Sequence, residues 1–171
     1  MTAVLGTVAM AVVAAVLPVS PAAAAETCTT TWRTLQFGDS GRHAVVEPGA
    51  PWHVRLGTAT NGYHLFLFCV QTSTSGKTRI RFDSNANGNL TAERGPSGQI
   101  VRRIHAAGFE PGWDTWYVCA LDAKWVEISF TPNDYFLGVN SSGYLDIEDD
   151  HPNGNALWRR SEFDGIDLVA C

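Results

Sequence analysis

The densest group of potentially reactive side chains is an acidic cluster in the last third of the chain. Its members are Asp146, Glu148, Asp149, Asp150 and His151, followed by Pro152-Asn153-Gly154-Asn155. Two carboxylates at a suitable separation can act as the general acid and base of glycoside hydrolysis. Acids this close in sequence, however, alternate between the faces of a strand or enter a solvated loop. We therefore expect the cluster to face a basic partner, and a small hydrolase is the last of three functional hypotheses.

A second pattern has the spacing of calcium ligands. Asp83-x-Asn85-x-Asn87-Gly88 matches the front half of an EF-hand loop, in which alternate side-chain oxygens surround the ion. The twelfth position is Arg94, and the acid falls one residue early at Glu93. A hairpin turn accounts for the Asn and Gly residues equally well. We expect no cofactor, with calcium at Asp83, Asn85 and Asn87 as the alternative.

Aromatic residues gather before the third cysteine, in Trp113-Asp114-Thr115-Trp116-Tyr117. An exposed Trp113 would stack on a sugar ring or a protein side chain, and Asp114 would bind hydroxyl groups. Trp116 and Trp158 are expected in the core. The predicted binding residues are therefore Trp113 and Asp114 in one loop, and Asp149, Asp150, His151 and Asn153 in another.

Composition excludes several classes of partner. The 171 residues contain 12 Lys and Arg against 17 Asp and Glu, a net charge of −5, and no segment gathers the basic residues. Such a chain is a poor match for nucleic acid or for an anionic membrane surface. The 6 Trp, 8 Phe and 4 Tyr provide enough apolar surface for one folded domain.

The first 25 residues are typical of a secretory signal peptide. Met1–Ala25 contains no charged residue, and an apolar run from Val4 to Val19 leads into four alanines, Ala22 to Ala25. An apolar segment followed by small residues predicts export and cleavage near Ala24 or Ala25. We thus expect a secreted, extracellular domain over residues 26–171, without membrane insertion once the signal is removed.

All four cysteines lie in the expected mature domain, at Cys28, Cys69, Cys119 and Cys171. In an exported chain an even number of cysteines predicts disulfides, and four cysteines allow three pairings. A metal site is not favoured, because no cysteine lies within four residues of another.

The elements that would position these residues are strands. Twelve or so short runs rich in Val, Ile, Thr, Trp and Phe alternate with turn residues, and no amphipathic helix of useful length occurs. This spacing favours an all-β sandwich or barrel. A partial internal repeat supports it, because Leu56-Gly57 with Gly62-Tyr63 recurs as Leu137-Gly138 with Gly143-Tyr144.

The segment from Val126 to Phe163, with Tyr135-Phe136-Leu137-Gly138-Val139 followed by Gly143-Tyr144-Leu145 and then Trp158, resembles one repeat of a β-trefoil. It is most similar to the repeats of fascin and the fibroblast growth factors. The resemblance implies a barrel of about twelve short strands in three repeats with adjacent chain ends. Adjacent ends in turn imply the pairing Cys28–Cys171 and Cys69–Cys119. The alternative fold is a disulfide-bonded β-sandwich.

No group of residues combines a nucleophile, a base and a residue that orients the base, so we predict no enzymatic activity. The leading hypothesis is a secreted binding module that acts through protein–protein contacts. It would be an adaptor subunit of a larger secreted assembly or an inhibitor of a secreted enzyme, and its partner would be another secreted or cell-surface protein. The alternative is a lectin-like module that binds a polysaccharide.

Overall fold

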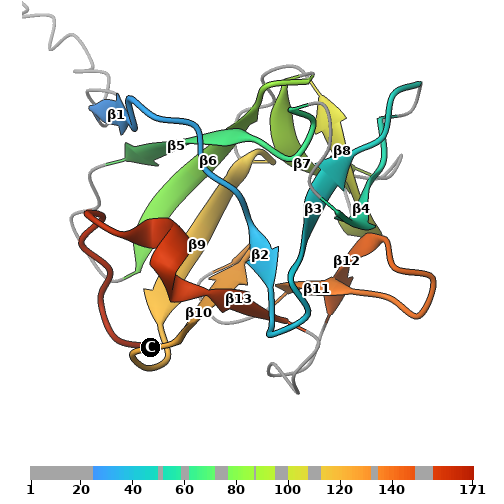
Figure 1. Ribbon diagram of the computed structural model, residues 1–171. Helices are drawn as coiled ribbons and strands as arrows, with labels where there is room; N and C mark the ends of the chain where they lie inside the picture. Colours follow the sequence, from blue (N-terminus) through green and yellow to red (C-terminus); the bar gives the residue numbers. More distant parts are fainter. Residues whose placement is uncertain are drawn as a thin grey trace, which may run out of the picture.

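The computed structural model describes residues 25–49, 52–58, 62–71, 77–86, 88–94, 100–107, 113–131, 135–148 and 156–171 (Figure 1). The predicted signal peptide falls almost entirely on residues 1–24, outside these ranges. Within the described ranges, no helix has both the length and the apolar character needed to cross a membrane.

The described residues form a strand-rich domain with one short 3₁₀ helix, η1 (Arg160–Phe163). The strands are β1 (Glu26–Cys28), β2 (Gln36–Phe37), β3 (Arg42–Val46), β4 (Val54–Gly57), β5 (Phe66–Gln71), β6 (Thr78–Ser84), β7 (Asn89–Arg94), β8 (Ile100–Ala107), β9 (Thr115–Ala120), β10 (Trp125–Ser129), β11 (Phe136–Val139), β12 (Leu145–Glu148) and β13 (Leu157–Arg159).

Six strands form a closed barrel in the order β5-β6-β9-β10-β13-β2. The barrel closes where Arg33, just before β2, exchanges two backbone hydrogen bonds of 2.8 Å with Phe66 at the start of β5. The alternation that a barrel wall requires is clearest in β6, where Ile80 and Phe82 are buried and point inward while Arg79 and Arg81 point outward.

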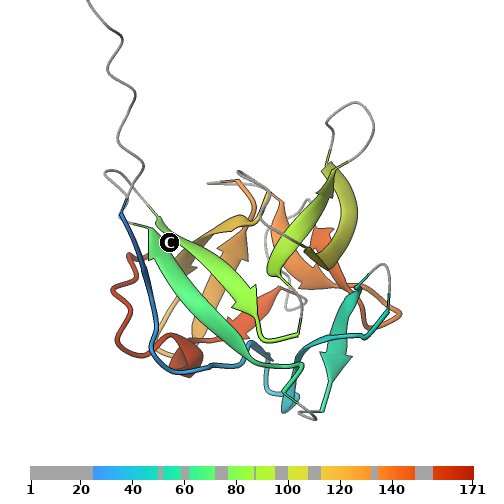
Figure 2. The same ribbon diagram turned by 90° about the horizontal axis from the view of Figure 1, so that it is seen from above.

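Three hairpins, β3–β4, β7–β8 and β11–β12, complete the domain. They contact one another and lie together on the right in Figure 1, beside the barrel. Figure 2 shows the same division from above. Each hairpin stands between two barrel strands in sequence, so the chain makes three four-stranded repeats, β2–β5, β6–β9 and β10–β13. This topology confirms the all-β, three-repeat prediction and excludes the sandwich, which needs two facing sheets.

Equivalent positions of the three repeats carry the largest core side chains. Phe66, Trp116 and Trp158 each stand at the same point of their repeat, opposite Arg33, Ile80 and Val126 respectively. All three large rings are fully buried. The Trp116 indole donates a 2.8 Å hydrogen bond to the Leu90 carbonyl, and the Trp158 indole donates one of the same length to the Leu137 carbonyl. The expectation that both tryptophans belong to the core is confirmed.

The internal repeat seen in the sequence does not relate equivalent elements. Leu56-Gly57 ends β4, the second strand of its hairpin, whereas Leu137-Gly138 lies in β11, the first strand of its hairpin. The similarity reflects a local preference for glycine in tight turns rather than the three-fold arrangement, which superimposes β4 on β12.

The disulfide pairing predicted from adjacent chain ends is wrong. The bonds are Cys28–Cys69 and Cys119–Cys171. Cys28 lies directly opposite Cys69 because β1 pairs with β5 as an additional edge strand. At the other end, Cys171 donates a backbone hydrogen bond of 3.0 Å to Ala120, next to Cys119.

Sheet geometry explains why the expected pairing cannot form. Cys69 lies in β5 and Cys119 in β9, and β6 runs between these two strands. Strands in a sheet lie about 4.8 Å apart, so two strands separated by a third are roughly 9.6 Å apart. That exceeds the roughly 7 Å that a disulfide can span between Cα atoms.

Candidate functional site

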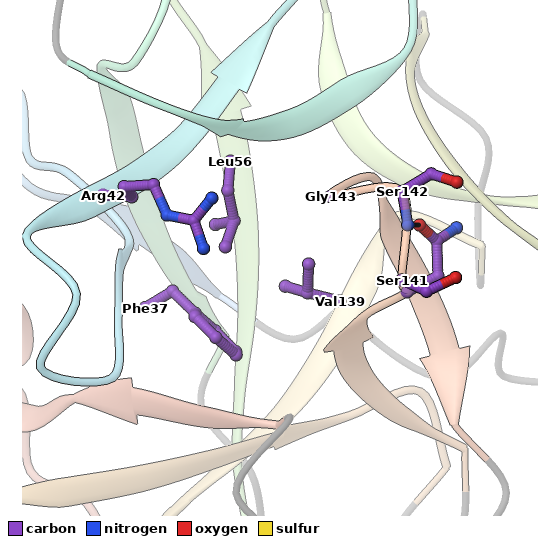
Figure 3. A pocket seen from close by; sticks show the side chains of 8 residues that line it. Phe37, Arg42, Leu56, Val139, Ser141, Ser142 and Gly143 are labelled. Carbon is purple, nitrogen blue, oxygen red and sulfur yellow. Dashed lines mark hydrogen bonds between the residues drawn. The ribbon is translucent and has the colours of Figure 1, made fainter.

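A pocket of about 290 Å³ lies between the first and third repeats (Figure 3). Its apolar lining consists of Phe37 from β2, Leu56 from β4 and Val139 from β11. Phe37 is half-buried and packs edge-on against Trp158, with 5.5 Å between ring centroids. The core therefore holds the ring of Phe37 in place while one side of it reaches the pocket.

The polar lining comes from two turns. Arg42 follows the β2–β3 turn, and Asn140, Ser141, Ser142 and Gly143 form the β11–β12 turn. In Figure 3 the Arg42 side chain extends toward Leu56 and Phe37, and the two serines stand on the opposite side. The lining residues that the structure describes include one cation and two hydroxyl groups but no carboxylate.

The β2–β3 turn holds Arg42 at the pocket through its own hydrogen bonds. The Ser40 hydroxyl donates to the Phe37 carbonyl at 2.6 Å and accepts from the Arg42 amide at 3.2 Å. Gly38 and Gly41 have φ values of 51° and 66°, which residues with a Cβ seldom adopt. The sequence Gly38-Asp39-Ser40-Gly41 therefore folds locally into a tight turn that points Phe37 and Arg42 toward the same space.

Asp39 ties this turn to the third repeat. Its carboxylate accepts a 2.6 Å hydrogen bond from Lys124 and also pairs with Arg159. The hydrogen bond from Lys124 is the main reason why the pKa of Asp39 is lowered. Both cations also lie over the Trp125 ring, with Lys124 Nζ 4.6 Å and the Arg159 guanidinium 5.1 Å from its centroid. These contacts fix the β2–β3 turn against β10 and β13 of the third repeat.

The β11–β12 turn is organised by Asn140. Its side-chain oxygen accepts hydrogen bonds from the amides of Ser142 and Tyr144 at 3.0 and 3.1 Å. Its side-chain nitrogen donates to Asp146 at 3.2 Å. The Gly143 carbonyl accepts a 2.8 Å hydrogen bond from Leu56 of the first repeat. Asn140 is thus occupied with the turn, and the polar groups left to a ligand are those of Arg42 and the serines.

Neither of the two predicted binding residues that the structure describes, Trp113 and Asp114, lines the pocket. Trp113 is half-buried and packs against Phe130 with 5.4 Å between ring centroids. Asp114 is fully buried, and its carboxylate accepts a 2.9 Å hydrogen bond from Asn89, so it stabilises the barrel end and does not face solvent. Asp149, Asp150, His151 and Asn153 lie outside the described residues.

The structure places part of the acidic cluster and of the calcium pattern. Asp146 and Glu148 occupy the outward positions of β12, between the buried Leu145 and Ile147. Asp83 lies in β6 opposite Asn89, and the following turn is closed by a 2.7 Å hydrogen bond from Ser84 to Gly88. This is the hairpin that the sequence offered as the alternative to an EF-hand.

The calcium site stays a prediction, because Asn87 lies outside the described residues. Over the described ranges, three potential metal ligands converge only at Glu26 with Cys28 and Cys69, and at Glu127 with Cys119 and Cys171. In both groups the sulfurs are joined in a disulfide.

A pair of histidines forms a second polar cluster beside the β2–β3 hairpin. The rings of His43 and His64 lie 6.2 Å apart, and the buried Nδ1 atom of each has no hydrogen-bond partner. Burial is the main reason why the pKa of His43 is lowered; nearby His64 acts in the same direction and the Glu162 carboxylate opposes them. Burial thus favours the neutral form of the His43 imidazole.

Comparison with known proteins supports the fold but not a close relationship. No protein-family model and no curated protein matches the chain. Among solved structures, the designed three-fold symmetric protein ThreeFoil aligns with a TM-score of 0.61 at 11% identity, over 75% of this chain and 96% of its own. BEL, a protein solved as a β-trefoil, aligns with a TM-score of 0.56 at 17% identity, over 83% and 95%. The fold is a β-trefoil.

A further β-trefoil match is to a lectin. The Polyporus squamosus lectin, solved with a human-type influenza-binding epitope, has a TM-score of 0.56 at 10% identity. The alignment covers 81% of this chain and 49% of the lectin, so this chain spans about half the lectin's length. At these identities the comparisons establish the fold alone.

Sequence reasoning did not identify the pocket. The Asn140–Gly143 turn lies about a hundred residues after Phe37 and Arg42 in the sequence, and no motif joins the two segments. The sequence did indicate the two turns themselves, because both segments are rich in Gly, Ser and Asn or Asp, as hairpin turns are. Only the trefoil topology, which packs the first and third hairpins together, shows that the two turns form one site.

Proposed function

We propose that this protein is a secreted, non-enzymatic carbohydrate-binding module that holds its ligand in the pocket between the first and third repeats. The observation that carries the proposal is the composition of that pocket. An apolar floor that includes Phe37 faces a polar rim of Arg42, Ser141 and Ser142. A sugar ring presents the matching surfaces, with C–H groups on its faces and hydroxyl groups around its edge.

The size and contents of the pocket favour a small polar ligand. Its volume of about 290 Å³ is at the lower end of the range for small-molecule sites, and it would accommodate one or two sugar rings. The half-buried Phe37 ring is available for stacking, and rigid aromatic side chains lose little conformational entropy on binding. The lectin among the trefoil neighbours supports the same class of ligand.

Secretion is part of the proposal and is supported by two observations. The two disulfides are typical of proteins that leave the reducing cytoplasm. The uncharged, apolar Met1–Ala25 segment has the composition of a signal peptide. Mass spectrometry of the protein from the culture medium of its host tests this directly, because secretion predicts an N-terminus near Glu26.

The carbohydrate proposal is tested by blocking the pocket from its exposed rim. Ser142→Tyr places a large ring at a solvent-exposed position whose hydroxyl makes no hydrogen bond in the described structure. The matched control is Ser161→Tyr, an equally exposed serine in η1 that does not line the pocket. Both variants should fold, as judged by their circular dichroism and melting temperatures.

The measurement is binding of the mature protein and both variants to an array of neutral, carboxylated and sulfated saccharides. Wild type and Ser161→Tyr should bind the same saccharides, and Ser142→Tyr should lose at least tenfold in affinity for them. An array on which the wild type binds nothing, or on which Ser142→Tyr binds as well as the control, contradicts the proposal.

A protein partner is the second candidate function, and one side chain favours it. Trp32 lies before β2 and is 43% exposed. Exposed tryptophans are enriched among the residues that dominate protein–protein affinity. An adaptor or inhibitor role predicts that the mature protein retains a stoichiometric partner from culture fluid and that Trp32→Ala releases it. Equal retention by Trp32→Ala removes this surface from consideration.

A further inference from the structure

The pocket contains a positive charge that the protein itself does not neutralise. Arg42 is exposed, makes no ion pair and donates no side-chain hydrogen bond within the described structure. Most other arginines there have polar partners: Arg55 pairs with Glu47, Arg81 with Glu26, and Arg159 with Asp39, whereas Arg79 lies over the Tyr117 ring. Arg33 and Arg160 donate to backbone carbonyls of Glu162 and Asp122.

Among the described residues, no acid pairs with Arg42. The described lining of the pocket includes no carboxylate. The described acids beside the two turns have other partners: Asp39 pairs with Lys124 and Arg159, and Asp146 accepts from Asn140 at 3.2 Å and from the Ile147 amide at 2.8 Å. Those contacts hold Asp146 in the turn. The guanidinium therefore extends into a space beside Phe37, Leu56 and Val139, and the turn that carries Ser141 and Ser142 lies on the opposite side (Figure 3).

We propose that the pocket selects saccharides that carry an acidic group, with Arg42 binding the oxyanion. This inference rests on the proposed carbohydrate-binding function and names its ligand class. The planar guanidinium presents paired N–H donors that match the two oxygens of a carboxylate, and it binds a sulfate in the same way. The turn that carries Ser141 and Ser142 bounds the ligand on the opposite side, and Phe37 packs against the ring that carries the acid.

The charge of the whole protein makes the proposal specific to this position. A net charge of −5 repels anions at long range, so no general electrostatic attraction draws an acidic sugar to the surface. Selectivity for acidic over neutral saccharides must then come from short-range contact with Arg42. One ion pair should also give a weak salt dependence, in contrast to a surface that binds a polyanion through many charges.

The test compares Arg42→Gln, which removes the charge, and Arg42→Lys, which keeps the charge but loses the paired donors. The matched control is Arg55→Gln, an exposed arginine one strand away that does not line the pocket. On the array of neutral, carboxylated and sulfated saccharides, wild type and Arg55→Gln should bind mainly acidic ones. Arg42→Gln should lose about tenfold in affinity for these and little for neutral ones, and Arg42→Lys should fall between.

The outcomes separate this inference from the proposed function. Binding to neutral and acidic saccharides alike, unchanged in Arg42→Gln but lost in Ser142→Tyr, would overturn the acidic preference and leave carbohydrate binding intact. A second readout does not depend on the array: titration with sodium acetate and sodium sulfate, followed by the NMR shifts of the Arg42 Nε–H and the Ser141–Gly143 amides. If these shifts saturate in wild type and vanish in Arg42→Gln while the array shows no saccharide binding, the anion site stands and carbohydrate binding is refuted. An absence of such shifts in wild type overturns the anion site.

Discussion

The indole hydrogen bond of Trp158 offers a direct measure of how the trefoil core is held. Trp158 is fully buried, and its N–H donates to the Leu137 carbonyl at 2.8 Å. Trp158→Phe removes that donor from a buried carbonyl, which costs about 1–3 kcal/mol. The smaller ring also leaves unfilled space, which adds roughly 1 kcal/mol. We expect the free energy of unfolding to fall by about 3 kcal/mol, equivalent to a decrease of roughly 6–12 °C in Tm for a domain of this size.

The assay is urea denaturation with the disulfides intact, followed by far-ultraviolet circular dichroism. Trp32→Phe is the control, because Trp32 is 43% exposed and its indole makes no hydrogen bond in the described structure, so its replacement should change stability by less than about 0.5 kcal/mol. Trp116→Phe should resemble Trp158→Phe, since Trp116 makes the equivalent bond to Leu90. If Trp158→Phe were as stable as Trp32→Phe, the indole bond would not contribute to the core and the reasoning would be refuted.

Three further predictions concern buried polar groups and the disulfides. Because burial lowers the pKa of His43 from its ordinary value of about 6.5, the unfolded chain binds this proton more readily, and stability should fall as the pH drops below 6.5. His43→Asn should flatten that dependence in urea melts at about pH 7.5 and about pH 5.5, and an unchanged slope would contradict the assignment to His43. Lys77→Met removes the ammonium group that lies 2.7 Å from the carboxylate of Glu127, whose side chain is 2% exposed, and should cost about 3–5 kcal/mol. Replacing Lys77 and Glu127 together by Met should recover much of that loss, and a double variant no more stable than Lys77→Met would argue against a buried ion pair. The double substitution of Cys119 and Cys171 by Ala opens a loop with a sequence separation of 52 and should cost up to about 4 kcal/mol in the same melts, whereas a loss below about 1 kcal/mol would show that the unfolded chain is not constrained there.

The disulfides show how far sequence reasoning extends in this chain. That Cys28, Cys69, Cys119 and Cys171 are all oxidised followed from their even number and is confirmed. Their pairing did not follow, because it depends on which strands are neighbours. The edge strand β1 brings Cys28 to Cys69, and the position of β6 keeps Cys69 away from Cys119. Strand order is a property of the closed barrel and leaves no trace in the spacing of cysteines.

The candidate site likewise combines features that the sequence predicts with features that only packing decides. Asp114 was predicted to bind a ligand because it follows Trp113, which was expected to be exposed. In the structure Asp114 is buried and hydrogen-bonded to Asn89. A buried carboxylate with a side-chain partner and an exposed one have the same local sequence, so only packing distinguishes them. The sequence did not single out Arg42, because an isolated arginine beside a turn is ordinary; its significance comes from its place in the pocket without an acidic partner among the described residues.

By itself, then, the sequence determined the all-β class, the trefoil character of the third repeat and the burial of Trp116 and Trp158. These features arise from alternation along a strand and from the demands of tight turns, which act over a few residues. The tertiary structure alone decided which cysteines pair, which acids are buried and where the pocket lies. Those outcomes depend on contacts between residues distant in sequence, and barrel closure sets these contacts when it brings Phe37 and Arg42 of the first repeat beside the Asn140–Gly143 turn of the third.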